Sequence, residues 1–172
     1  MPDSLRAAIR DVVDFPTPGI VFKDITPILA DGKLFSKSIS LLCETAGGAR
    51  IDKVVGIDAR GFIFASAVAD RLGVGLVPVR KKGKLPWKTR QCAYALEYGE
   101  AIMELHEDAV KPGESILLVD DLLATGGTAA AAVKLLDELG ANLIGISFLI
   151  ELSILGGRSK IAPHPISSII IY

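Results

Sequence analysis

The clearest pattern of apolar and polar positions lies in the second half of the chain. Residues 116–119 form the short, uninterrupted apolar run that a buried parallel strand needs. Two carboxylates follow, Asp120 and Asp121, where we expect the strand to leave the sheet. A loop of small residues, 124–128, then leads into an alanine- and leucine-rich run that Gly140 is placed to end as a helix. The pattern therefore predicts strand, loop and helix in succession.

The remaining elements follow from the same two periodicities. Short apolar runs predict strands, and apolar positions three and four residues apart predict helices. The expected strands are residues 54–58, 74–79, 143–150 and 168–171, with two more in 92–106 that turn near Tyr98. The expected helices are residues 4–13, 34–42 and 62–72. This alternation predicts an α/β protein with a mainly parallel central sheet and helices on both of its faces.

Residues 15–29 break the pattern, because three prolines and a glycine interrupt them. The segment is nevertheless rich in apolar residues, which a surface loop without a task would not need. We therefore expect a fixed, partly buried flap, in which Phe22 could stack on a flat ring. The backbone near Val21 and Lys23 would hydrogen-bond the edge of that ring. On composition alone, a core anchor is the better interpretation of Phe22.

A second irregular stretch, residues 80–91, carries six basic residues and no acidic one. Gly83 and Pro86 favour a mobile loop here. Such a loop suits a lid that closes on a polyphosphate and excludes water. A solvated loop and a nucleic-acid contact are the alternatives, although one short basic loop with a single aromatic residue is thin support for the latter.

The loop at 124–128 has the composition of a phosphate cradle. Its glycines let the backbone approach an anion, and the start of the following helix favours negative charge. Thr128 is placed to cap that helix and Thr125 to offer a hydroxyl to the phosphate. The loop matches neither the Walker A pattern nor Gly-x-Gly-x-x-Gly. A simple turn at the end of a strand is the competing interpretation.

The acidic pair before this loop suits a phosphorylated sugar. Carboxylates accept hydrogen bonds from neighbouring hydroxyls, as in a ribose phosphate. Adjacent strand residues point to opposite faces, so one of Asp120 and Asp121 would face the ligand, and the sequence does not say which. Arg60, between a strand and a helix, is a further anion ligand or simply an exposed loop charge. The carboxyl ends of parallel strands share one edge, so these groups should meet there.

Composition narrows the class of protein. With 172 residues, a net charge of −1 and 50% hydrophobic residues, the chain fits one globular domain with no general attraction to nucleic acid or membrane. Two cysteines make no disulfide framework, so we expect a reducing cytoplasm. We expect no secretory leader and no membrane span. Two histidines and no Cys-x-x-Cys argue against a structural zinc site.

The run LVDDLLATGGT at 118–128 resembles the phosphoribosyl diphosphate motif of type I phosphoribosyltransferases, in the form found in those that act on adenine. Matching segments extend from about residue 15 to residue 151, including FPTPG at 15–19 and LEYG at 96–99. The resemblance implies a single phosphoribosyltransferase domain over residues 1–172. It assigns residues 15–29 to a base-binding flap and 80–97 to a lid.

The resemblance also implies an activity. The phosphoribosyl group of 5-phosphoribosyl 1-diphosphate would pass to adenine, giving AMP and diphosphate in purine salvage. Mg²⁺ would be held mainly by substrate and water, and the enzyme would be a cytoplasmic homodimer. By position, Glu97 would be the catalytic acid/base, and Arg60 would stabilise the leaving diphosphate. The implied substrate-binding residues are Val21, Phe22, Lys23, Ala59, Arg60, Arg80, Lys84, Tyr98, Asp120, Asp121, Ala124, Thr125, Gly126, Gly127 and Thr128.

Three other functions remain open at this stage. A related enzyme acting on a 6-oxopurine would share the phosphate loop, but the flap at 15–29 argues against it. A non-catalytic sensor of the sugar diphosphate should carry an added DNA-binding helix-turn-helix, for which 172 residues leave no room. A nucleic-acid binder that uses the basic stretch alone is the most remote.

Overall fold

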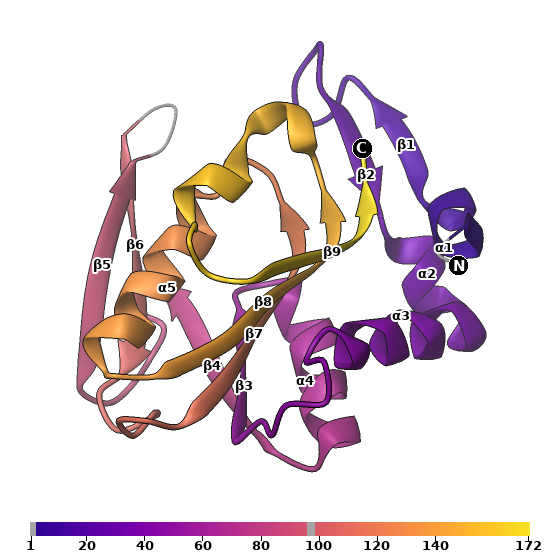
Figure 1. The fold of residues 1–172 in the computed structure, drawn as a ribbon. Helices are drawn as coiled ribbons and strands as arrows, with labels where there is room; N and C mark the ends of the chain where they lie inside the picture. Colours follow the sequence, from indigo (N-terminus) through magenta and orange to yellow (C-terminus); the bar gives the residue numbers. More distant parts are fainter. Residues whose placement is uncertain (1–2, 96–98) are drawn as a thin grey trace.

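A mainly parallel sheet forms the centre of the structure, a computed structural model that describes residues 3–95 and 99–172. Over these residues the sheet has seven strands in the order β5-β6-β4-β3-β7-β8-β9 (Figure 1). The strands are β3 (Lys53–Ile57), β4 (Gly75–Lys81), β5 (Thr89–Ala95), β6 (Glu100–His106), β7 (Ser115–Leu123), β8 (Asn142–Glu151) and β9 (Ile166–Ile171). The β4–β6 and β5–β6 pairs are antiparallel, and the other neighbouring strands of this sheet are parallel. The predicted α/β architecture is confirmed.

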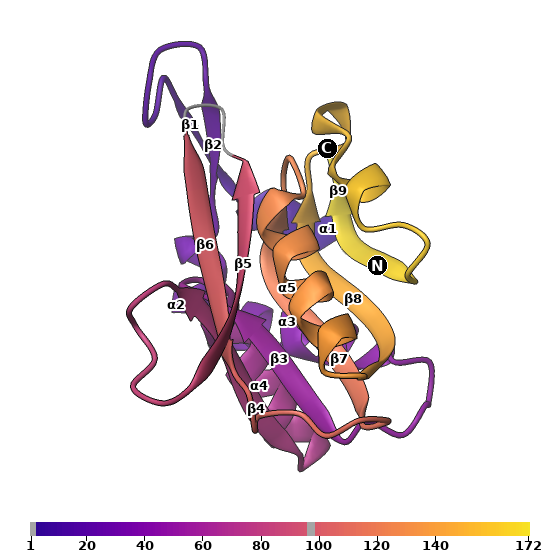
Figure 2. The same ribbon diagram turned by 90° about the vertical axis from the view of Figure 1, so that its left-hand side faces the viewer.

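Helices cover both faces of this sheet and create two hydrophobic cores. The helices are α1 (Asp3–Ala8), α2 (Thr26–Ala30), α3 (Gly32–Glu44), α4 (Gly61–Leu72) and α5 (Gly127–Glu138), with short 3-10 turns η1 (Ser153–Leu155) and η2 (Gly157–Lys160). Helix α5 packs on one face with the β5–β6 arm, and α1 to α4 pack on the other (Figures 1 and 2). This sandwich fixes the carboxyl ends of β3, β4 and β7, where the predicted phosphate ligands lie.

The predicted helix over residues 4–13 is wrong in its second half. Helix α1 ends at Ala8, and Arg10–Val13 forms strand β1, which pairs antiparallel with β2 (Val21–Asp24). The apolar positions of this segment fit a helix face and a strand face equally well. The cross-strand pair of Val12 with Phe22 and the β-branched Val12 and Val13 favour the strand.

The flap at 15–29 is also more regular than predicted. Its prolines at 16 and 18 lie in the turn of the β1–β2 hairpin, which is closed by hydrogen bonds from the Phe15 N–H to the Ile20 carbonyl and from the Gly19 N–H to Asp14 Oδ1. The third proline, at 27, lies in the first turn of α2, where a missing N–H costs nothing. The flap is therefore a hairpin followed by a short helix (Figure 1).

Two further boundaries differ from the expectation. Strand β7 continues through Asp120 and Asp121 to Leu123, because β8 provides partners at Phe148, Ile150 and Glu151. Both ends of the basic stretch at 80–91 belong to strands. Strand β4 reaches Lys81 and β5 begins at Thr89, which leaves 82–88 as the loop. Within the described residues, no helix is both long and apolar enough to span a membrane.

Candidate active site

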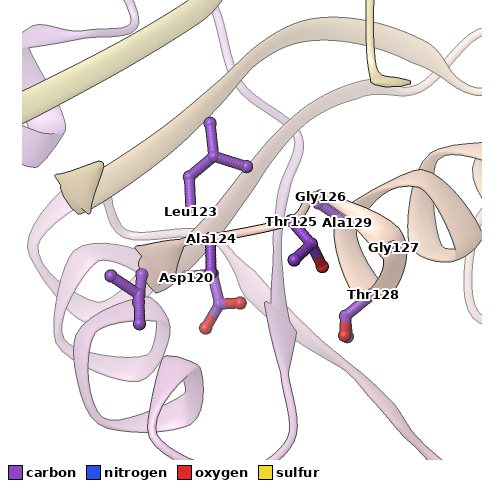
Figure 3. A pocket seen from close by; sticks show the side chains of 9 residues that line it. Asp120, Leu123, Ala124, Thr125, Gly126, Gly127, Thr128 and Ala129 are labelled. Carbon is purple, nitrogen blue, oxygen red and sulfur yellow. The ribbon is translucent and has the colours of Figure 1, made fainter. Parts of the chain in front are cut away.

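The predicted phosphate loop surrounds a small cavity of about 90 Å³ at the end of β7. Residues 122–129 line it together with Asp120, and Figure 3 shows the side chains of Asp120, Thr125 and Thr128 projecting on the same side of the loop. Gly126 has φ +79°, which a side chain would strain, and it precedes the first residue of α5. The cavity therefore faces the N–H groups of the first turn of a helix, a site that favours anions.

Thr128 does not cap α5 as predicted. The helix begins at Gly127, two residues before the start that a Thr128 cap implies, and Gly126 occupies the cap position without a side-chain hydrogen bond. The Thr128 hydroxyl lies 3.3 Å from the Tyr94 hydroxyl on β5 instead. With no side chain capping the helix, the N–H groups of its first turn face the cavity and suit an anionic ligand.

The two carboxylates of the central motif have different surroundings. Asp120 lines the cavity, and its Oδ1 accepts the Asp121 N–H at 2.8 Å. Asp121 is buried and pairs with the Arg60 guanidinium at 2.8 Å. Burial, and next the charge of Asp121, raise the pKa of Asp120 well above its usual value. Burial also raises the pKa of Asp121, against the opposing effect of Arg60.

Arg60 connects the central motif to the flap. It precedes the first residue of α4, and its guanidinium lies between the Asp121 carboxylate and the Phe22 ring, 5.1 Å from the ring centroid. Ala59 beside it is exposed. Phe22 packs edge-on against Phe15 at 5.2 Å between ring centroids. The structure therefore brings Phe22, Arg60 and Asp121 together, from three segments far apart in sequence.

A second, apolar cavity of about 530 Å³ lies between the flap and the segment after β8. It is lined by Gly19, Ile20, Val21, Thr125, Leu152, Ile154, Leu155 and Tyr172. Thr125 lines both cavities, so the apolar cavity and the phosphate cavity meet at this residue. A ligand with a flat apolar part and an anionic part could span them.

Of the flap residues predicted to contact a ring, only Val21 lines the apolar cavity. The prediction for Lys23 concerned its backbone and stays a prediction. The Lys23 ammonium bonds Asp11 at 2.7 Å and lies 4.1 Å from the ring centroid of Tyr172, which lines the apolar cavity. The sequence interpretation missed the cavity walls formed by Ile154, Leu155 and Tyr172. The exposure of Ile154, 92%, is a signal visible only once the fold is known.

A hydrogen bond links the predicted lid cations Arg80 and Lys84. Arg80, on β4, donates to Asp58 at 3.1 Å and to the Lys84 carbonyl at 3.3 Å. Lys84 is exposed in the 82–88 loop. Asp58 begins the turn after β3 and precedes Ala59, so Arg80 adjoins the loop that carries Arg60. The predictions for Glu97 and Tyr98 lie outside the described residues.

Comparisons with known proteins agree with this geometry. The family model described as "Phosphoribosyl transferase domain" matches residues 24–164. Adenine phosphoribosyltransferase of Acidothermus cellulolyticus is 56% identical over 166 residues, covering 96% of this chain and 94% of the relative. That of Anaeromyxobacter dehalogenans is 53% identical over 172 residues, the whole of both chains.

Solved structures agree as well. Adenine phosphoribosyltransferase from Thermoanaerobacter pseudethanolicus superposes with a TM-score of 0.96 at 47% identity, over the whole of both chains. The Saccharomyces cerevisiae enzyme, solved with adenine and an iminoaltritol bisphosphate, gives 0.92 at 40% identity over 97% of each chain. With the family model, the relatives and the solved folds in agreement along the chain, the protein belongs to the adenine phosphoribosyltransferases, within the phosphoribosyl transferase domain family.

Proposed function

We propose that the two adjoining cavities hold the two substrates of the adenine phosphoribosyltransferase reaction. The single observation that carries this assignment is the junction of the cavities at Thr125. The anion-binding cavity suits the 5′-phosphate of 5-phosphoribosyl 1-diphosphate, and the apolar cavity suits a purine ring. Adenine would then lie beside the ribose carbon that it attacks. The yeast relative solved with adenine supports a base site in this fold.

In this proposal each segment of the site has one task. The N–H groups of 124–128 and the Thr125 hydroxyl bind the 5′-phosphate. Asp120 accepts hydrogen bonds from the ribose hydroxyls, because it faces the cavity, whereas Asp121 orients Arg60. Val21 contacts the base directly. The side chains of Phe22 and Lys23 support the site without contacting the base. Phe22 packs against Arg60, and Lys23 packs against Tyr172. Residues 15–29 and 80–97 thus serve as flap and lid of one domain.

The reaction forms a bond from a ring nitrogen of adenine to the anomeric carbon as the bond to diphosphate breaks. Arg60, Arg80, Lys84 and the backbone at Ala59 would stabilise the charge that develops on the leaving diphosphate. Glu97, with Tyr98 beside it, would take the proton that adenine loses. The transition state has oxocarbenium character, as in glycoside hydrolysis. The products are AMP and diphosphate, which makes this a purine salvage reaction.

We also propose that Mg²⁺ takes part. The site offers carboxylate oxygens at Asp120 and Asp121, which suit a hard cation as well as ribose hydroxyls. The described residues contain no cluster of three or more histidine, cysteine or acidic groups able to hold a metal by themselves. Mg²⁺ keeps several waters and binds substrate phosphates, so substrate oxygens and water would supply most of the ligands. When bound, Mg²⁺ supplies positive charge to the diphosphate.

Assembly and location complete the proposal. We expect a homodimer in the cytoplasm. Apolar side chains exposed on neighbouring elements, Ile63 on α4 and Leu76 on β4, are available for a subunit contact. Cys43 and Cys92 are free, which fits a reducing compartment. Sedimentation or size-exclusion measurements would establish the subunit number.

The base assignment predicts a selective reaction. Diphosphate release, followed by a coupled assay with 5-phosphoribosyl 1-diphosphate and Mg²⁺, should occur with adenine and not with hypoxanthine or guanine. A site built around one purine leaves polar groups unpaired when another binds, which discriminates strongly. Release with the oxopurines would overturn the assignment of the apolar cavity. Binding of the sugar diphosphate without release for any base would instead favour a non-catalytic sensor.

Replacing Asp120 with asparagine should raise the KM for 5-phosphoribosyl 1-diphosphate about tenfold, because hydrogen bonds to a charged acceptor are stronger by about 1–2 kcal/mol. The same change should increase stability at neutral pH. The folded-state pKa of Asp120 lies above its unfolded value, so the wild type loses stability as pH rises through that window. Asparagine does not ionise and escapes this loss.

The measurement is a pair of thermal melts across a pH series together with steady-state kinetics. The Tm advantage of the asparagine variant should be greatest at neutral pH, shrink as the pH falls toward 4, and vanish below about pH 3, where the aspartate is protonated in both states. Unchanged kinetics would remove Asp120 from the site. A Tm advantage that does not vary with pH would show that ionisation of this group is not its cause.

A further inference from the structure

A buried carboxylate outside the proposed substrate contacts holds the basic loop. Glu104 lies on β6 with only 2% of its surface exposed. Its Oε1 accepts the N–H groups of Lys84 at 3.0 Å and Leu85 at 2.9 Å. Its Oε2 faces the Thr89 hydroxyl at 3.4 Å and the Gln91 amide at 3.5 Å. Every one of these groups lies in or beside the loop between β4 and β5.

The charge of Glu104 is stabilised by this loop rather than by a cation. Within the part of the chain that the structure describes, no basic side chain is paired with it. Burial by itself would raise the pKa of Glu104, but the backbone N–H groups of Leu85, Gly83 and Lys84 hold it below its usual value. A buried carboxylate that depends on three successive backbone donors fixes the turn that presents them.

The turn at 83–85 also contacts Arg80, one of the proposed ligands of the diphosphate. Arg80 lies directly opposite Glu104 in the β4–β6 pairing. The Arg80 guanidinium donates to the Lys84 carbonyl at 3.3 Å and to Asp58 at 3.1 Å. Lys84 is thus held from both sides, its N–H by Glu104 and its carbonyl by Arg80. Figure 2 shows the loop standing out from the edge of the sheet.

We propose that Glu104 is a positioning residue for phosphoribosyl transfer: it fixes the turn at 83–85 so that Lys84 and Arg80 meet the diphosphate of the substrate. The inference rests on the proposed role of these two cations. Glu104 acts on the reaction only through them, since its carboxylate is buried and occupied. Loss of the anchor should therefore weaken use of the sugar diphosphate while leaving the base site intact.

The test compares Glu104→Gln with the control Glu107→Gln, which removes an exposed carboxylate just beyond the same strand. Glu104→Gln should lower kcat/KM for 5-phosphoribosyl 1-diphosphate about tenfold, the scale expected when a catalytic group is displaced by less than 1 Å. The KM for adenine should stay within about twofold of wild type. Glu104→Asp, which keeps the charge but withdraws it by one methylene, should show the same loss. Glu107→Gln should match wild type.

The loop also carries its own reporter. Trp87 is the single tryptophan of the chain, it is 64% exposed, and its backbone N–H lies 3.4 Å from His106 Nε2. Its fluorescence should become more accessible to iodide in Glu104→Gln at a temperature well below Tm, and trypsin should cut after Lys82 or Lys84 several times faster. A residue needed only for folding would change neither readout below Tm.

A mutant cycle separates the outcomes. If Glu104 acts only through Lys84 and Arg80, its substitution should cost at most about twofold in a background that lacks both cations, Lys84→Ala with Arg80→Ala. A full, additive loss there would overturn the inference. Wild-type kinetics in Glu104→Gln together with a loss in Lys84→Ala would also overturn it, while leaving the proposed role of Lys84 in place. Wild-type kinetics in both Glu104→Gln and Lys84→Ala would overturn the inference and also show that the lid has no role in the reaction.

Discussion

Replacing Gly61 with alanine is expected to lower kcat/KM for 5-phosphoribosyl 1-diphosphate about 100-fold while leaving the protein folded. A Cβ at this position would overlap Asp120 Oδ1 and lie 3.2 Å from its Cγ and 3.3 Å from its Cα. The carboxylate is the part that can move, so the clash would turn it away from the ribose hydroxyls. A displacement of about 1 Å at a reacting site costs on the order of 100-fold.

Stability should change little in the same variant. Gly61 is the first residue of α4, and alanine is favoured over glycine in helices by about 0.5–1 kcal/mol, which offsets part of the strain. Gly32→Ala is the matched control, because Gly32 is also the first residue of a helix and no atom lies within 4 Å of its added Cβ. It should keep wild-type kinetics. Full activity of Gly61→Ala would show that the position of Asp120 does not matter.

The sequence predicts the central features of the fold because they depend on strong local patterns. The apolar run at 116–119, the small-residue loop and the helix that follows appear in the structure in that order, as β7, 124–126 and α5. The prediction of an element is wrong where one pattern of apolar residues fits both a helix and a strand. Residues 10–13 carry apolar positions that suit a helix, and only pairing with Val21–Asp24, 8 to 14 residues away, makes them a strand.

The site could be predicted in part for the same reason. Asp120, Arg60 and the phosphate loop stand at the ends of strands, so the parallel topology alone places them at one edge. The apolar cavity could not be predicted, because Tyr172 and Leu155 reach it from the far end of the chain. In the sequence, nothing distinguishes Glu104 from other charged residues of a strand. Its role follows only from the contacts that bury it in the structure. Long-range contacts carry no local signal.

The largest expected effect on the phosphate loop comes from Gly157, which is outside it. A Cβ here would overlap the Ala124 carbonyl oxygen and lie 2.9 Å from the Gly126 nitrogen and 3.0 Å from Leu123 Cδ1. Two of these three atoms belong to the backbone of the loop. Gly157→Ala should therefore raise the KM for 5-phosphoribosyl 1-diphosphate by about 100-fold, since the N–H groups that bind the 5′-phosphate must shift.

In this variant the phosphate loop at 124–128 has to shift, because the segment that carries Gly157 is held in place. Arg158 beside it makes two bonds to the buried Glu151, at 3.1 and 2.6 Å, and a third to the Ile166 carbonyl at 3.0 Å. This ion pair ties η2 to β8 and β9, so the segment cannot retreat from the loop. Overpacking of this kind costs about 1–3 kcal/mol, and each kcal/mol lowers Tm by about 2–4 °C at this chain length. The variant should melt several degrees below wild type.

Gly156→Ala is the control that separates stability from loop geometry. Gly156 has φ +64° and no atom within 4 Å of an added Cβ, so alanine there costs about 1–2 kcal/mol of backbone strain without touching the loop. Both variants should lose Tm in thermal melts, but only Gly157→Ala should lose affinity for the sugar diphosphate in steady-state kinetics. Equal kinetics in the two variants would mean that the loop tolerates the added methyl group. A loss confined to Gly157→Ala would identify close approach at Gly157 as the contact that shapes the phosphate site.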